Sequence, residues 1–159
     1  MSRRAFSFQP GCRIKPGHFE SIPVGKSLYR SGTDERDLND NQSSLRHYTN
    51  AVEIYRDQND SLRLAHTLRH VAEILRHEGH LAEAGQNYIE ALDMYRKHEG
   101  TPPLDLANTL RGFALLKTDL NEVAASERLW QEARTLYQSL GIQAGVDESD
   151  AQLHMLRSG

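Results

Sequence analysis

Residues 62–95 read LRLAHTLRHVAEILRHEGHLAEAGQNYIEALDMY and contain the clearest pattern in the chain. The first half has apolar residues at three- and four-residue spacing, which forms one face of an α-helix: Leu64, Ala65, Leu68, Val71, Ala72 and Leu75. The second half has the same spacing, with Leu81, Ala84, Tyr88, Ala91, Leu92 and Tyr95. Gly79 lies between the halves, where a left-handed residue would end the first helix. The stretch therefore predicts two antiparallel helices joined by a tight turn.

The same pattern returns further along the chain in a second copy. In register, Leu64, Ala65, Thr67, Leu68, Arg69 and Ala72 fall on Leu106, Ala107, Thr109, Leu110, Arg111 and Ala114. A half-copy precedes both, because Tyr48, Ala51, Tyr55 and Arg56 have the same spacing as Tyr88, Ala91, Tyr95 and Arg96. Repeated hairpins bury their apolar faces on their neighbours, so residues 43–140 predict an all-α fold, an α-solenoid of stacked antiparallel hairpins.

One run resembles the tetratricopeptide repeat (TPR), a helix–turn–helix unit with small and large residues at fixed positions: Leu68-x-x-Val71-Ala72-x-x-Leu75-x-x-x-Gly79-x-Leu81-x-x-Ala84-x-x-x-Tyr88-x-x-Ala91. The 42-residue period exceeds the family's usual 34 and is similar to the variant found in kinesin light chains. The second copy departs from the run, with Asn121 in place of Gly79, Ser126 for Ala84 and Lys117 for Leu75. The resemblance implies a scaffold that binds another protein and is not an enzyme.

The segments that flank the repeats follow neither pattern. Residues 1–42 end in a polar run from Thr33 to Asn41, so we expect an irregular or partly disordered leader. The first helix of the half-copy should occupy about 22–40; either a helix forms around Asp34 to Leu38, or the edge stays open and favours a homodimer. Residues 141–159 begin with Gly141 and carry Ala151, Leu153 and Leu156, which predict a C-terminal capping helix.

Composition excludes several classes of function. The 159-residue chain has a formal net charge of −3, which argues against binding nucleic acid or anionic membranes, since both need clustered positive charge. No apolar run approaches the roughly 20 residues that span a bilayer. No secretory signal is evident and Cys12 is the single cysteine, so we expect a cytoplasmic location.

The chain offers little for catalysis or cofactors. Gly25-Lys26-Ser27 resembles only the end of a phosphate-binding loop, because Glu20 stands where the first glycine is required. His66, His70 and His77 share one stripe of the predicted helix over 62–78, and histidines one turn apart can bind Zn²⁺. The second copy has other residue types at these positions, so a polar helix face is favoured. A metal-binding protein is kept as an alternative, and no cofactor is expected.

In tetratricopeptide arrays the first helix of each hairpin lines the concave face, so the resemblance implies that a partner binds there. We expect a peptide or helix of another protein to contact the polar side of these helices at His66, Arg69, Glu73, Arg76, His77, Asn108, Arg111 and Leu115. Arg69 and Arg111 recur in register, and guanidinium groups pair with carboxylates, so an acidic partner segment is one interpretation. The other is that both arginines pair with acids of the chain itself.

Two further expectations concern this face. Leu115 either anchors a partner or packs under the C-terminal helix. The three histidines of the stripe, at an ordinary pKa near 6.5, would make the face more positive below about pH 6. We therefore hypothesise that affinity for an acidic partner rises as the pH falls.

Overall fold

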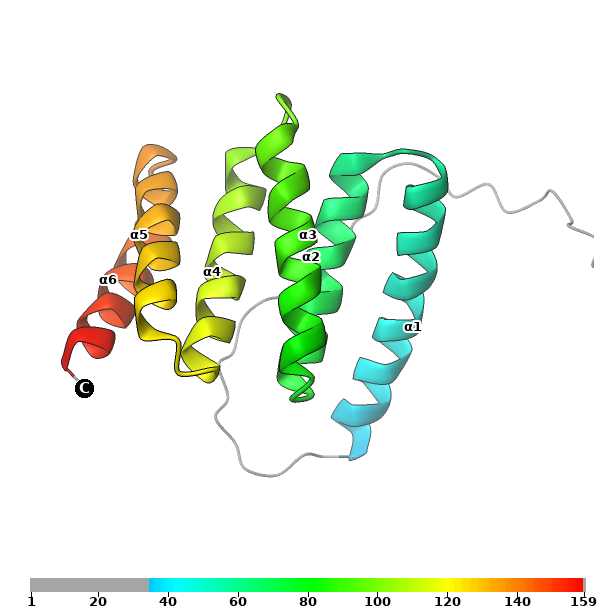
Figure 1. Ribbon diagram of the computed structural model, residues 1–159, viewed down its shortest axis with the longest axis horizontal. Helices are drawn as coiled ribbons and strands as arrows, with labels where there is room; N and C mark the ends of the chain where they lie inside the picture. The colour runs from blue at the N-terminus through cyan, green and yellow to red at the C-terminus, as the bar shows by residue number, and fades with distance from the viewer. Residues whose placement is uncertain (1–34, 159) are drawn as a thin grey trace, which may run out of the picture. The chain divides into compact units, whose positions relative to one another are not determined.

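The computed structural model describes residues 35–158, which form six helices and no strand. They are α1 (Glu35–Asp57), α2 (Ser61–His77), α3 (Leu81–Lys97), α4 (Pro103–Asp119), α5 (Val123–Ser139) and α6 (Gln143–Ser158). Each helix packs against the next one along the chain, and α2 also contacts α4 (Figure 1). The predicted all-α solenoid of helix hairpins is confirmed. No helix among the described residues is long and apolar enough to cross a bilayer.

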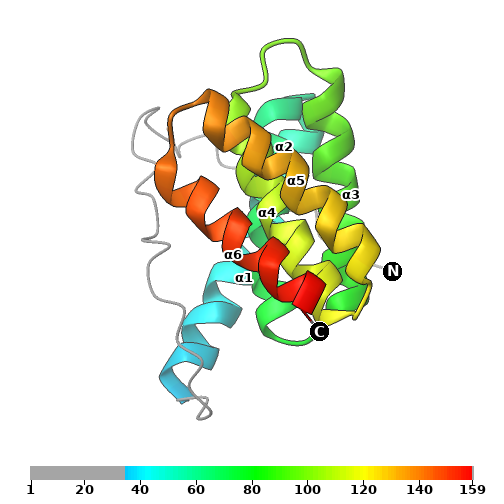
Figure 2. The ribbon, with the colours of Figure 1, turned by 90° about the vertical axis from the view of Figure 1, so that its left-hand side faces the viewer.

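The hairpins follow the repeats in the sequence. The pairs α2–α3 and α4–α5 are the two complete copies, and α1 is the second helix of the half-copy. Because α1 begins at Glu35, residues 35–42 are helical although they belong to the segment predicted as a leader; residues 1–34 lie outside the described part. In the segment expected to cap the array, α6 lies against α5 (Figure 2).

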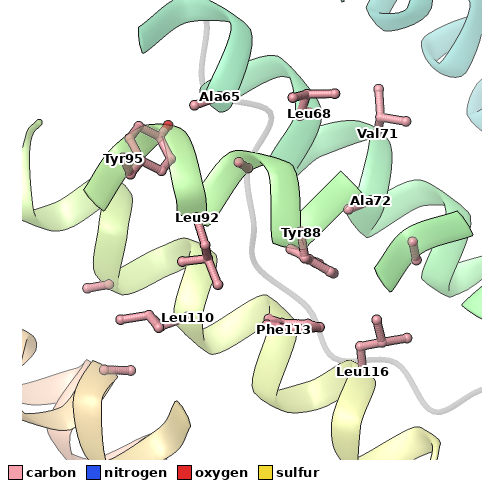
Figure 3. Packing of buried hydrophobic residues seen from close by; sticks show 14 of the residues in the cluster. Ala65, Leu68, Val71, Ala72, Tyr88, Leu92, Tyr95, Leu110, Phe113 and Leu116 are labelled. Atoms are coloured by element: carbon pink, nitrogen blue, oxygen red, sulfur yellow. The ribbon is translucent and has the colours of Figure 1, made fainter. Parts of the chain in front are cut away.

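Small residues of the repeat let the helices approach closely, and large residues fill the space between hairpins. Ala65, Ala72, Ala84 and Ala91 are fully buried in the first hairpin. Tyr88 of α3 stacks on Phe113 of α4, with 5.6 Å between ring centroids, and joins the two hairpins (Figure 3). A smaller cluster at the C-terminal end is formed by Ala114, Trp130 and Leu153, which connects α4, α5 and α6. The core is therefore continuous from one repeat to the next.

The turn inside each hairpin depends on a left-handed residue at one repeat position. Gly79 has φ +84° and Asn121, which replaces glycine in the second copy, has φ +58°. The same two backbone hydrogen bonds close both turns: Gly79 N donates to Arg76 O and His80 N to Leu75 O, while the second turn uses Asn121, Thr118, Glu122 and Lys117. Asparagine tolerates this conformation better than other residues with a side chain, which explains why the substitution leaves the turn unchanged.

We expect Asn121→Ala to lower the free energy of unfolding by about 1 kcal/mol, because alanine is strained at positive φ. Asn121→Gly should raise it by about 0.5 kcal/mol, since glycine adopts this conformation freely. Urea denaturation measures both changes. Asn87→Ala, within α3, is the matched control and should not destabilise; an equal loss there would contradict this explanation.

A row of ion pairs follows the repeat on the side of the second helices. Arg56 of α1 pairs with Glu90 of α3 at 2.7 Å, and Arg96 of α3 pairs with Glu132 of α5 at 2.8 Å. Both arginines occupy one repeat position, and both glutamates another. The side chains of both pairs are about half exposed, so each pair contributes little to stability. On this side of the array, the charges of these arginines and glutamates are thus neutralised within the chain.

Candidate functional site

The predicted partner-binding residues lie on α2 and α4, and we call this surface the first-helix face. It comprises His66, Arg69, Glu73, Arg76 and His77 on α2, and Asn108, Arg111 and Leu115 on α4. Apart from the exposed His77, all of these residues are partly buried. Three acidic residues that were absent from the predicted set, Asp105, Asp119 and Glu148, also contact the face.

Polar side-chain contacts connect each first helix to the next. His66 Nδ1 lies 3.8 Å from Asp105 Oδ1, and Arg76 Nη1 donates to Asp119 Oδ2 at 2.8 Å, so both pairs connect α2 to α4. Arg111 of α4 makes two hydrogen bonds of 2.7 Å to the carboxylate of Glu148 on α6. This bidentate pair, which raises the pKa of Arg111, holds α6 against the array.

Arg69 occupies the same repeat position as Arg111 but has different contacts. Its side chain is 11% exposed, and Nη2 donates to His70 Nε2 at 2.8 Å. The carboxylate of Glu73 is 3.7 Å from Nη1, within ion-pair range. Each of the three arginines of the face thus meets one acid of the chain, Glu73, Asp119 or Glu148, and Asp105 lies beside His66. These contacts agree with the interpretation in which the arginines pair with acids of the chain.

Two of the three stripe histidines do not have the ordinary pKa that the sequence suggested. His70 stacks on Tyr48 of α1, with 5.1 Å between centroids, and its Nε2 accepts from Arg69. Because arginine only donates, neutral His70 must carry its proton on Nδ1. Burial, with Arg69 beside it, lowers the pKa of His70 to about 3. Partial desolvation of the imidazole, with Arg76 beside it, also lowers the pKa of His77, although that residue is exposed at the surface. His70 therefore stays neutral near pH 6, and the shift of His77 opposes its protonation there, so the expected rise in affinity loses part of its physical basis.

The histidine stripe does not assemble a metal site in the described part of the chain. His66 Nε2 lies 3.2 Å from His70 Nε2, but the Arg69 guanidinium donates to the same His70 nitrogen. No group of three or more histidine, cysteine or acidic side chains among residues 35–158 is arranged to hold a metal ion. A cation at this position would meet the positive charge of Arg69.

Asn108 and Leu115 are both engaged by neighbouring helices. The Tyr137 hydroxyl of α5 donates to Asn108 Oδ1 at 2.8 Å, which fixes the orientation of this amide within the second hairpin. Leu115 packs against the cluster of Ala114, Trp130 and Leu153, and therefore contacts the region under α6. Of the two interpretations offered for Leu115, the contacts agree with packing.

The acidic residues absent from the predicted set differ in whether the sequence could have identified them. Asp105 lies one helical turn before Asn108, so its position on the helical stripe was available from spacing alone. Glu148 lies on α6, a helix outside the repeat, far along the chain from Arg111. Nothing in the sequence sets the angle at which α6 docks, so this pair required the structure.

We expect Glu148→Gln to lower the free energy of unfolding by about 1 kcal/mol, because the charge-assisted bidentate contact with Arg111 is lost while the shape is kept. The effect should be confined to α6, which would separate from the array more often. Faster amide hydrogen exchange of residues 143–158 would detect this. Asp147→Asn, at the exposed neighbouring position, is the control and should leave exchange unchanged. Equal exchange in both variants would refute the role assigned to the pair.

Comparison with known families supplies independent information. Residues 24–97 match the model of the tetratricopeptide repeat family, a range that includes α1, α2 and α3. No curated protein and no solved structure matches the chain. The family match supports a tetratricopeptide repeat protein, and repeats of this family generally mediate protein–protein interactions. The kinesin-light-chain-like variant remains a prediction.

Proposed function

We propose, from the premise that this is a tetratricopeptide repeat protein, that it is a non-enzymatic scaffold that binds a peptide or helix of another protein on its first-helix face. The observation that carries the proposal is the gathering of partly buried polar side chains from α2 and α4 on one surface. Side chains held by neighbours lose little further freedom on binding, so such a surface is preorganised for recognition. A cytoplasmic location remains a prediction from the sequence.

The contacts of the three arginines bear on whether the partner segment is acidic. An acidic segment would compete with Asp119 for Arg76 and with Glu148 for Arg111. Arg69 meets its acid, Glu73, only at the longer distance of 3.7 Å, so of the three arginines on the face it has the weakest carboxylate contact to give up. We therefore keep an acidic partner as a prediction that depends on Arg69 and expect no requirement for Arg111.

Site-specific photocrosslinking tests the scaffold proposal. A photoreactive phenylalanine analogue is placed at His77, which is exposed on the first-helix face, or at Ile89, which is 59% exposed on α3 beside the ion pairs of the second helices. In source-cell lysate, the probe at His77 should crosslink one protein in saturable fashion, and the probe at Ile89 should not. Crosslinking from Ile89 alone would move the site to the second helices.

A homodimer is the alternative function, and one observation favours it. Tyr48, Ala51 and Tyr55 of α1 are only partly buried, so the N-terminal edge of the described array carries uncovered apolar surface. Light scattering over a range of protein concentrations separates the alternatives. A single-partner scaffold remains a monomer, whereas association through α1 gives a mass that rises with concentration.

A further inference from the structure

The C-terminal helix α6 has the register and contacts of a first helix. The helices α2, α4 and α6 begin at residues 61, 103 and 143, and the same position in each carries a hydroxyl: Thr67, Thr109 and Ser149. Each hydroxyl donates at 2.7 Å to the backbone carbonyl one helical turn before it. One turn further on, each helix buries an apolar side chain: Val71, Phe113 and Leu153. The register of the repeat therefore continues into α6.

The side of α6 that corresponds to a hairpin interface is polar. In α2 the residues of this side are apolar and buried in the first hairpin: Ala65, Leu68 and Ala72. The residues at the same positions of α6 are exposed and polar: Asp147, Asp150 and His154. This side of α6 therefore interacts favourably with water and does not need a further helix to cover it.

Met155 differs from these three residues, because it is apolar and belongs to the first-helix face. Its position in α6 corresponds to Glu73 in α2 and Leu115 in α4, which are both members of that face. Met155 is 56% exposed, and Ala151, one turn before it, is also exposed. The end of the array does not explain this exposed methionine, since the side of α6 that lacks a neighbouring helix is the polar one.

Apolar surface thus extends across the first-helix face where α4 meets α6. Leu115 is partly buried and packs against the cluster that contains Trp130. Leu156 of α6, which follows Met155 in the sequence, packs against the same cluster. The turn of α6 that carries Met155 therefore lies near Leu115.

Charge on the face decreases from α2 to α6. Three repeat positions of the face are charged in α2: Arg69, Glu73 and Arg76. The same positions in α6 are uncharged: Ala151, Met155 and Ser158. Where α4 and α6 meet, Arg111 and Glu148 neutralise each other through two hydrogen bonds of 2.7 Å. An acidic group of a partner is therefore complementary to the α2 end of the face, and an apolar side chain is complementary to the α6 end.

On the basis of the scaffold function proposed above, we propose that α6 forms part of the binding surface and that the partner segment is amphipathic. The segment packs a large apolar side chain against Leu115 and Met155 and directs a carboxylate toward Arg69. Leucine, methionine or phenylalanine at this position removes the exposed Met155 side chain from water, which stabilises the complex. A charged side chain there would lose hydration without gaining a partner, because Arg111 and Glu148 already pair with each other.

Selection of random peptides displayed on phage against the full chain tests the proposal. Enriched peptides should contain a large apolar residue and an acidic residue, and fluorescein-labelled synthetic forms are then titrated by fluorescence anisotropy. Met155→Lys should weaken binding at least about tenfold. Ile89→Lys is the matched control, since Ile89 of α3 is similarly exposed at 59% but lies outside the face, and this variant should bind as the wild type does.

Two double-variant cycles locate the two ends of the peptide. Replacing the apolar residue of the peptide by serine should weaken binding to the wild type at least about tenfold and change binding to Met155→Lys less than about twofold. Replacing its acidic residue by the corresponding amide should have the same pair of effects on the wild type and on Arg69→Gln. Circular dichroism verifies that each variant keeps its helices.

The outcomes separate the amphipathic partner from the scaffold function itself. Peptides that bind Met155→Lys and the wild type equally but lose affinity for Arg69→Gln would overturn the role of α6 and leave the scaffold function in place. Peptides that respond to neither substitution, or the absence of any enriched peptide, would overturn both. An equal loss in Ile89→Lys and Met155→Lys would indicate a general effect of added charge and would also overturn the role of α6.

Discussion

Gly112→Ala is expected to lower the free energy of unfolding by about 2 kcal/mol, although alanine normally favours a helix over glycine. A Cβ atom at residue 112 would lie 2.6 Å from the Tyr88 hydroxyl oxygen and 2.9 Å from Tyr88 Cε1. The Tyr88 ring cannot move aside, because it is 1% exposed and stacked on Phe113. The substitution therefore forces α3 and α4 apart at the contact that joins the two hairpins.

Two companion variants make this result interpretable. Gly85→Ala is the matched control within α3, where a Cβ would meet only Leu116 Cδ2 at 3.6 Å, so it should stabilise by about 0.5–1 kcal/mol. Tyr88→Phe removes the closest atom and should recover part of the loss in the Gly112→Ala background. Urea denaturation of the wild type, both single variants and the double variant gives the coupling energy between residues 88 and 112. A stabilising effect of Gly112→Ala would show that the hairpins are not in close contact there.

Acidification should destabilise the protein through His70. The pKa of this histidine is lowered to about 3 in the folded chain from an ordinary value of 6.5, so the unfolded chain binds the proton more readily. The stabilising contribution is present above pH 6.5 and is lost progressively as the pH falls toward 3. By pH 4 the loss should reach about 2–3 kcal/mol. Other titratable or charged groups also face His70: His66, Arg69 and Glu73 on α2, Tyr48 on α1 and Asp105 on α4.

Because those neighbours titrate or carry charge, the test compares pH slopes between variants. His70→Phe keeps a ring to stack on Tyr48 and removes the proton site, so its stability should fall less between pH 7 and pH 4 than that of the wild type. His80→Phe replaces an exposed histidine and should keep the wild-type slope. Chemical denaturation at several pH values measures these slopes. Identical slopes for wild type and His70→Phe would mean that His70 is not held neutral.

Residue 70 and residue 112 show how one repeat position can serve two purposes. They occupy the same position in successive copies, and each contacts a tyrosine of the preceding second helix. Tyr48 contacts His70, and Tyr88 contacts Gly112. With glycine at 112, Tyr88 approaches the backbone of α4 closely. With histidine at 70, the ring of Tyr48 stacks on the side chain. At this repeat position, α4 has a glycine that allows close helix contact, whereas α2 has a buried histidine whose protonation depends on pH.

The sequence by itself determined the helices of the two complete repeats, their turns and the faces they bury. The spacing of Leu64, Ala65 and Leu68 recurs with the period of an α-helix, and each turn has its left-handed residue where Gly79 and Asn121 stand. These features depend on residues close together in the chain, so local spacing is enough to predict them. The recurrence of the whole pattern then implied that hairpins stack, because a single hairpin cannot cover its own apolar face.

Only the tertiary structure decided how the polar residues of the first-helix face are used. The pairing of Arg111 with Glu148 depends on the docking of α6, and the low pKa of His70 depends on its burial against Tyr48 and Arg69. Both effects change steeply over distances of a few ångströms, which helical periodicity does not specify between separate helices. The pattern therefore identified which residues share the face, and the packing angles determined which of them carry charge and which acids they meet.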